Sequence, residues 1–295
     1  MKKEPWLAAP SETIRILQKY GFNFQKKYGQ NFLIDKRVLE KISKASNISE
    51  EDAVIEIGPG IGTLTQYLAY AAGRVYAVEI DRSLIPILDD TLSDWDNVRI
   101  IRGDIMELDL KALYEEASGQ GRKVRIAANL PYYITTPIMM KLLESRLPFE
   151  SITVMVQKEV AERMQAEPGG KDYGALSLAV QYYSHPHIDA QVPPNCFIPR
   201  PKVGSAVITL DLDFTHRLPE EKEKRLFQVI RAAFAQRRKT LVNSLSHFAE
   251  AGFSKEQIAA ALKQMGLDER IRGERLSLDR FIELTDRLNG GLPHV

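Results

Sequence analysis

The chain has 295 residues, of which 44% are hydrophobic and 27% are charged, close to the averages of globular proteins. This composition excludes a disordered, collagen-like or coiled-coil chain, and no apolar run approaches the ~18 residues of a membrane-spanning helix. Lys and Arg total 40 against 39 Asp and Glu, which argues against a histone-like binder. The lone cysteine, Cys196, and the lack of an apolar stretch behind Met1 predict a cytosolic protein without a signal peptide.

The first 45 residues are strongly basic, although the whole chain is nearly neutral. They hold ten basic and four acidic side chains, and a second basic group lies between Lys222 and Lys239. A run of charges is most often an ordinary solvated surface, and either region is compatible with that interpretation. Two separate basic regions in one neutral protein raise the odds of a polyanionic partner.

Residues 53–156 alternate between short apolar segments and helical patterns. Leu64, Leu68 and Ala71 are spaced as on one face of a helix. Short apolar runs separated by helices are typical of a parallel sheet that is covered on both faces. The sequence therefore predicts a doubly wound α/β fold with strands at Ala53–Ile57, Arg74–Ile80, Val98–Ile101, Val124–Ala128, Ile152–Val156 and Ala206–Leu212.

A second domain is predicted after Pro219, where β-branched runs disappear and helical periodicity takes over. Ser254 followed by Gln257 is typical of a helix start with a capping box. We expect an α/β domain over residues 1–215 and a small all-helical domain over residues 216–295. The first helix of the second domain is indicated by an apolar stripe of Phe227, Ile230, Phe234 and Leu241, flanked by Lys224, Arg231 and Arg238.

A glycine-rich turn follows the first predicted strand and precedes a helix. Its glycines, Gly58, Gly60 and Gly62, allow the backbone to turn sharply and to approach a ligand closely. The helix start offers unpaired N–H groups to a ligand. Taken alone, the pattern is also compatible with a tight turn that binds nothing.

Two carboxylates are expected at the ends of the next two strands. Glu79 lies 19 residues after Gly60, where nucleotide-binding sheets place an acid that accepts hydrogen bonds from ribose hydroxyls. Asp104 follows the third strand and is able to accept an adenine amino hydrogen. Either acid alone would be an ordinary surface residue. Together with the turn they predict a nucleoside site, because ligands bind at these strand ends.

The cofactor is inferred from the spacing and charge of the turn. The glycines give G-x-G-x-G rather than the dinucleotide pattern G-x-G-x-x-G, and Glu56, just before them, would repel a pyrophosphate. S-adenosylmethionine has no phosphate and carries a positive sulfonium and amino group. The sequence therefore favours S-adenosylmethionine, with NAD as the weaker alternative.

The segment Asn129-Leu130-Pro131-Tyr132 follows the fourth predicted strand. It supplies an amide oxygen, a backbone carbonyl turned by proline, and an aromatic face. Two acceptors that converge on an exocyclic amine would orient its lone pair toward a methyl donor, and the ring would stack on the base. The alternative, a simple turn, is the weaker interpretation, because the segment follows three features that are typical of a nucleoside site.

A series of motifs extends from residue ~20 to residue ~245. They are Gly29–Leu33, Glu56–Gly62, Val78–Asp81, Gly103-Asp104, Asn129–Tyr132, Phe197–Ala206 and Phe234–Leu241. These segments resemble the ribosomal RNA adenine N6-dimethyltransferases, specifically the small-subunit methyltransferase A family that modifies 16S rRNA. The Arg237-Arg238-Lys239 run favours that family over relatives that confer antibiotic resistance by acting on 23S rRNA.

The resemblance implies a class I S-adenosylmethionine-dependent methyltransferase, with a Rossmann-like, mostly parallel seven-stranded sheet and a helical domain that docks on the ribosome. It implies dimethylation of two adjacent adenosines in the 3′-terminal hairpin of 16S rRNA, within an immature 30S subunit, by a monomer. The implied cofactor contacts are Asn31, Leu33, Gly58, Glu79, Asp104 and Asn129. The implied catalytic residues are Asn129, Leu130, Pro131, Tyr132 and Phe197, with Phe197 facing Tyr132 across the target adenine.

Other functions have less support in the sequence. His185 and His187 flank a proline without partner cysteines, so we expect no metal site. Relatives of this fold serve as mitochondrial transcription factors, and a non-catalytic ribosome-assembly factor remains an alternative. The presence of Glu79, Asp104 and Asn129 argues against pure binding, since a protein without the cofactor has no need of them.

Overall fold

The computed structural model describes residues 4–25, 28–215, 217–248 and 252–289. The chain forms two compact units. The sheet unit comprises Met1–Ala161 and Pro186–Leu212, and the helical unit comprises Glu162–His185 and Asp213–Val295. Residue 216, at which the second domain is predicted to start, lies outside the described residues.

The elements of the sheet unit follow the predicted alternation. Its strands are β1 (Phe32–Leu33), β2 (Asp52–Ile57), β3 (Arg74–Glu79), β4 (Val98–Arg102), β5 (Lys123–Asn129), β6 (Ser151–Gln157), β7 (Ser184–Val192), β8 (Phe197–Ile198) and β9 (Ser205–Leu212). Its helices are α1 (Pro10–Lys19), α2 (Lys36–Ala45), α3 (Thr63–Ala71), α4 (Ile85–Thr91), α5 (Leu110–Ala117) and α6 (Thr135–Glu144), and α7 (Lys158–Met164) runs into the helical unit.

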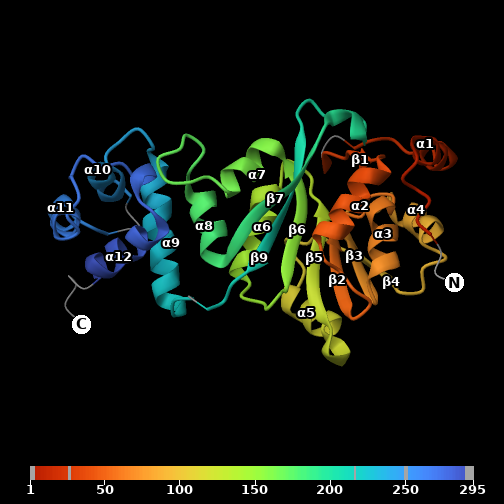
Figure 1. Ribbon diagram of the computed structural model, residues 1–295, viewed down its shortest axis with the longest axis horizontal. Helices are drawn as coiled ribbons and strands as arrows, with labels where there is room; N and C mark the ends of the chain where they lie inside the picture. Colours follow the sequence, from red (N-terminus) through yellow and green to blue (C-terminus); the bar gives the residue numbers. More distant parts are fainter. Residues whose placement is uncertain (1–3, 26–27, 216, 249–251, 290–295) are drawn as a thin grey trace. The chain divides into compact units, whose positions relative to one another are not determined.

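The described residues form a seven-stranded sheet in the order β4-β3-β2-β5-β6-β9-β7 (Figure 1). The strands from β4 to β6 are parallel, and β9 is antiparallel to β6. All six strands predicted from the sequence are present. The chain winds outward from β2 through β3 and β4, and outward on the other side through β5 and β6. This topology confirms the predicted doubly wound fold.

One face of the sheet carries an apolar cluster that includes residues of α2 and α3. Side chains that point to this face from successive strands, including Val54, Ala127 and Met155, pack with Leu39 and Leu68 of the two helices. Asp35 caps α2 by accepting a hydrogen bond from the Arg37 backbone N–H (2.9 Å). This packing supports the strand ends, which is where ligands of such sheets bind.

The helical unit contains α8 (Ala175–Tyr183), α9 (Glu220–Ala235), α10 (Leu241–Ser246), α11 (Lys255–Gln264) and α12 (Leu278–Asn289). The predicted boundary at residue 215 was wrong for Glu162–His185, because α8 packs against α9 rather than on the sheet. Tyr183 stacks on Phe227 with ring centroids 5.6 Å apart, and its hydroxyl donates to Glu223 of α9 (2.8 Å).

The basic flank predicted for the first helix of this unit is shorter than expected. Helix α9 ends at Ala235, so Arg238 lies in the following turn and Leu241 begins α10. The predicted helix start at Ser254 is confirmed, since its side chain and that of Gln257 form a capping box. No helix in the described part of the chain is long and apolar enough to cross a membrane.

Candidate active site

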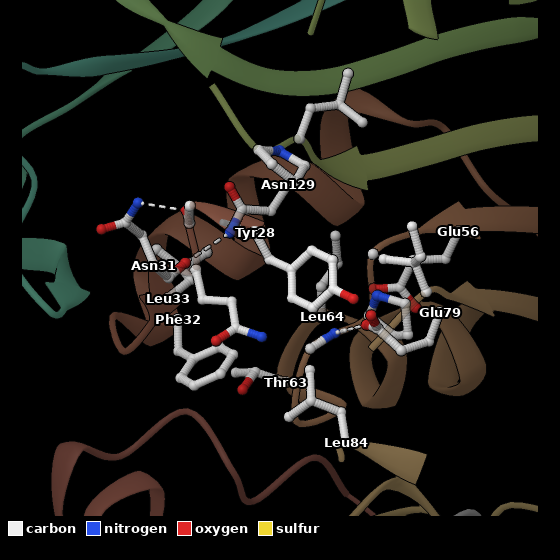
Figure 2. Close-up of a pocket in the computed structure, with 18 of the residues that line it drawn as sticks. Tyr28, Asn31, Phe32, Leu33, Glu56, Thr63, Leu64, Glu79, Leu84 and Asn129 are labelled. Carbon is white, nitrogen blue, oxygen red and sulfur yellow. Dashed lines mark hydrogen bonds between the residues drawn. The ribbon is translucent and has the colours of Figure 1, made fainter. Parts of the chain in front are cut away.

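A pocket opens where β2, β3 and β5 end (Figure 2). Its wall is built from four stretches of chain, namely residues 28–33, 56–64, 79–84 and 129–133. The carboxyl ends of β2 and β5 flank the point where the winding of the sheet reverses, which is where open α/β sheets bind their ligands. Figure 2 shows Asn31 and Asn129 on one side of the pocket, and Glu56 and Glu79 on the other.

The glycine-rich turn forms part of the pocket wall, and it is tightly packed at Gly60. Gly60 has φ +63°, and a Cβ atom there would lie 3.0 Å from the Phe32 ring. Its backbone N–H donates to Glu79 Oε2 (3.1 Å), so the turn and the end of β3 are fastened together. The sequence pattern therefore reflects a positive φ and a close approach, both of which require glycine.

Two carboxyl groups are buried in this wall. Glu79 is 4% exposed, and Glu56 is 1% exposed with an Oε2 atom that has no hydrogen-bond partner among the described residues. Burial raises the pKa of Glu56 to about 8, and the neighbouring Glu79 adds to the shift. Burial also raises the pKa of Glu79 to about 7, against the opposing hydrogen bonds from Asp81 and Gly60. Such a pocket disfavours anions and favours a cation.

These residues fit S-adenosylmethionine. The buried Glu56 oxygen without a partner suits a positively charged ligand, and Glu79 lies where ribose hydroxyls would donate to it. A pyrophosphate would instead be placed against two buried carboxyl groups. The sequence alone indicates for Glu56 only that it repels phosphate. The burial of its Oε2 atom without a hydrogen-bond partner among the described residues is in addition compatible with a cationic ligand.

The segment after β5 is fixed as a rigid corner of the pocket. Asn129 Nδ2 donates to the Asn31 carbonyl oxygen (3.1 Å), and its Oδ1 accepts no hydrogen bond in the described part of the chain. The Pro131 carbonyl accepts from Thr135 Oγ1 (3.1 Å), and the Tyr132 hydroxyl lies 2.7 Å from Ser205 Oγ. The amide oxygen is therefore held in place and remains open to a donor.

Most of the residues expected at the site are brought together by the fold. Those that line the pocket are Asn31, Leu33, Gly58, Glu79, Asn129, Leu130, Pro131 and Tyr132. Asp104 and Phe197 do not line it. Asp104 follows β4 and accepts a hydrogen bond from the Met106 N–H (2.8 Å) through Oδ1. Phe197 is 3% exposed, lies opposite Leu33 in the β1–β8 pair, and packs in the apolar core. Their ligand contacts stay predictions.

The wall formed by residues 28–33 also includes contacts that the sequence did not indicate. Tyr28 and Gln30 line the pocket beside Asn31. Gln30 Nε2 donates to Asp81 Oδ2 (2.6 Å), and Gln25 Nε2 donates to Asp81 Oδ1 (3.3 Å). Asp81 in turn donates its N–H to Glu79 Oε1 (2.8 Å). The N-terminal segment is thus connected through Asp81 to Glu79, the carboxylate for which a ribose contact is predicted. Gln30 lies within the Gly29–Leu33 motif, which was the available signal in the sequence.

Fold and site together define a class I S-adenosylmethionine-dependent methyltransferase. The protein-family description that matches residues 21–289 is ribosomal RNA adenine dimethylase. The chain belongs to this family, and it is an S-adenosylmethionine-dependent rRNA adenine dimethyltransferase.

Curated relatives match over nearly their whole length. A ribosomal RNA small subunit methyltransferase A from Lachnoclostridium phytofermentans is 56% identical, covering 95% of this chain and 97% of its own. The same-named protein of Alkaliphilus oremlandii is 50% identical, covering 96% and 98%. Among solved structures, a dimethyladenosine transferase from Plasmodium falciparum has a TM-score of 0.73 at 26% identity, covering 88% of this chain and 98% of its own. The 23S rRNA methyltransferase ErmE, at 24% identity and TM-score 0.65, covers 88% and 100% and shares the fold.

The raised pKa values predict a pH-dependent stability. In the folded, cofactor-free protein, Glu56 and Glu79 hold protons up to about pH 8 and about pH 7, whereas the unfolded chain releases them near pH 4.5. The folded state therefore binds more protons within this range, and the free energy of unfolding should fall as pH rises through it. Bound S-adenosylmethionine favours the ionised carboxylates, so it should raise the Tm more at pH 8 than at pH 6.

Thermal unfolding with and without cofactor measures this effect. Glu56→Gln keeps the shape of the side chain but removes its titration. In this variant the rise in Tm caused by the cofactor should therefore differ less between pH 8 and pH 6 than in the wild type. A wild-type protein whose Tm rises equally at both pH values would contradict the assignment of the two carboxylates to the cofactor.

Proposed function

We propose that this enzyme transfers methyl groups to N6 of two adjacent adenosines in the 3′-terminal hairpin of 16S rRNA, two to each, within an immature 30S particle. It acts in the cytoplasm as a monomer and uses no metal. The observation that carries the proposal is the open Oδ1 of Asn129, held beside Asn31 in the same pocket as Glu79. The small-subunit name of relatives at 56% and 50% identity supports 16S rRNA as the substrate.

The residues of the pocket act mainly by positioning. Bound S-adenosylmethionine supplies an electrophilic methyl group on a sulfonium. Asn129 Oδ1 and the Leu130 carbonyl accept the N6 hydrogens, which directs the nitrogen lone pair out of the plane of the base and toward the methyl donor. Tyr132, whose hydroxyl is fixed by Ser205, offers its ring to the adenine. No strong general base is needed, since attack of an amine on a sulfonium is easy once the atoms are aligned, and alignment supplies most of the rate.

Mass spectrometry of 16S rRNA tests the proposal. Immature 30S particles are incubated with the enzyme and isotope-labelled cofactor, and label is expected in dimethyladenosine at two adjacent positions of the 3′-terminal hairpin. Label in 23S rRNA instead would overturn the choice of substrate. Particle binding without any label would favour the alternative of a non-catalytic assembly factor.

The helical unit contributes docking to this function. Arg231, Arg238 and Lys239 are exposed and make no ion pair with described residues. Arg237 differs from them, because its guanidinium donates to the carbonyls of Lys171 (2.7 Å) and Tyr173 (3.1 Å). Arg237 therefore has a structural role in the helical unit. The cations available to RNA phosphates are its neighbours.

Charge reversal of Arg238 and Lys239 to Glu is expected to weaken binding to the immature 30S particle and to flatten its salt dependence. Fewer phosphate contacts release fewer counterions, so the slope of log K against log salt should lose about 0.7–0.9 for each contact removed. Filter binding at several salt concentrations measures the slope, and cofactor affinity should not change. The control is Lys255→Glu with Lys263→Glu, which makes the same change of charge on α11. A wild-type slope in the Arg238 and Lys239 variant would locate the docking surface elsewhere.

A further inference from the structure

The segment Pro199–Gly204 joins β8 to β9 and begins beside the pocket. We call it the 199–204 loop. Strand β8 pairs with β1 in antiparallel register, with Ile198 opposite Phe32. The chain after Ile198 therefore leaves in the direction of the residue before Phe32, which is Asn31. Asn31 lines the pocket and its carbonyl holds Asn129. One end of the loop is thus fixed next to the proposed amine-binding corner.

The other end of the loop is fastened to the same corner. Ser205, the first residue of β9, has its Oγ 2.7 Å from the Tyr132 hydroxyl. Just before it, the Gly204 carbonyl accepts a hydrogen bond from the Lys158 N–H (3.0 Å). Pro199 and Pro201 restrict the backbone in between. Both ends and the interior of the loop are therefore constrained relative to Asn129 and Tyr132.

The loop presents two cations that nothing in the described part of the fold neutralises. Arg200 and Lys202 are exposed and form no ion pair or hydrogen bond with described residues. No acidic residue occurs in the sequence from Pro193 to Gly204. Some other cations of the sheet unit do have acidic partners, such as Lys19, which pairs with Asp90. The pocket therefore has buried carboxyl groups inside and free positive charge at its edge.

This distribution of charge matches a nucleotide whose base is inserted into the pocket. A base that leaves its stack still carries its sugar and its two flanking phosphates, which stay outside. We propose that Arg200 and Lys202 bind the phosphates that flank the target adenosine and so hold the nucleotide while its base lies against Tyr132. The inference deepens the proposed function and rests on it. It adds to the sheet unit a phosphate contact that is separate from docking by the helical unit.

The test uses a double variant that carries both Arg200→Gln and Lys202→Gln. It is compared with the wild type in single-turnover methylation of immature 30S particles at saturating cofactor. The half-saturating particle concentration should rise roughly three- to thirty-fold, as for the loss of two exposed ion pairs. The rate at saturating particle should stay within about twofold, because the lost contacts are made equally before and during transfer. The salt slope should become shallower by about 1.4 in total.

Three further measurements separate phosphate binding from a general loss of charge and from a loss of folding. Arg200→Lys with Lys202→Arg keeps both charges and should keep the wild-type slope. Arg74→Gln with Arg122→Gln removes two charges at the opposite edge of the sheet, where β3 and β5 begin, and should leave the slope unchanged. Cofactor affinity by calorimetry should be the same in all variants, which shows that each is folded.

The possible results also separate the role of the loop from the proposed function. A double glutamine variant with the wild-type salt slope overturns the role of the loop, while methylation by the wild type still stands. An equal loss of slope in the Arg74 and Arg122 control also overturns it, since overall charge would then account for the effect. If the wild type methylates no 16S rRNA, the proposed function fails. The same salt titration of binding to the isolated hairpin then decides whether the loop binds phosphate.

Discussion

Asn129→Ala is expected to lower the single-turnover rate of methyl transfer by about a hundredfold or more, the scale of a misaligned reacting group. The fold places this amide at the end of β5 with its nitrogen used by Asn31 and its oxygen free, so truncation removes the acceptor that orients the amine. Binding to the 30S particle should change little, because it depends on phosphate contacts elsewhere. Single-turnover methylation measured beside filter binding separates the two effects.

Asn129→Asp serves as the matched variant, because it keeps an acceptor oxygen but loses the N–H that donates to Asn31. An intermediate rate is expected, which would assign part of the effect to the acceptor and part to the contact with Asn31. Near-normal turnover in Asn129→Ala would mean that Asn129–Tyr132 is a turn without a role in the chemistry.

Glu79→Ala is expected to weaken S-adenosylmethionine binding by about 1.5–3 kcal/mol, the usual scale for hydrogen bonds to a charged group. The carboxylate is buried, lines the pocket, and is aimed by hydrogen bonds from Gly60 and Asp81. Calorimetry measures the loss directly. Glu107→Ala, which removes an exposed acid close to Asp104 at the same edge of the sheet, should bind the cofactor normally. Undiminished binding by Glu79→Ala would exclude the ribose role of Glu79.

The strands were predictable because their apolar runs are local, and in all of them but β4 most side chains are buried. Strand β7 was missed, since His185, Pro186 and His187 interrupt an edge strand whose exposed side chains alternate with buried ones. The two-residue strands β1 and β8 are too short to leave a pattern. The assignment of α8 failed for another reason, because its aromatic partner, Phe227, is distant in the sequence.

The location of candidate site residues was predictable where they stand at a strand end. Glu79 and Asn129 occupy the ends of β3 and β5, and the topology brings such ends together. The effect of burial could not be predicted in the same way. Three features depend on three-dimensional packing: one carboxyl oxygen of Glu56 is buried without a hydrogen-bond partner among the described residues, Phe197 is packed in the core, and Arg237 donates to backbone carbonyls.

The contacts of Asp81 have a consequence for the timing of turnover. One carboxylate holds Gln25 and Gln30, and through them a wall of the pocket. Repeated methylation of one particle requires spent cofactor to leave and fresh cofactor to enter several times. Each exchange that passes this wall must break and remake the same hydrogen bonds, and such opening steps limit the rate of many enzymes. For an exchange that takes this route, the lifetime of the Asp81 contacts would limit how soon the next methyl group can be transferred to the bound RNA.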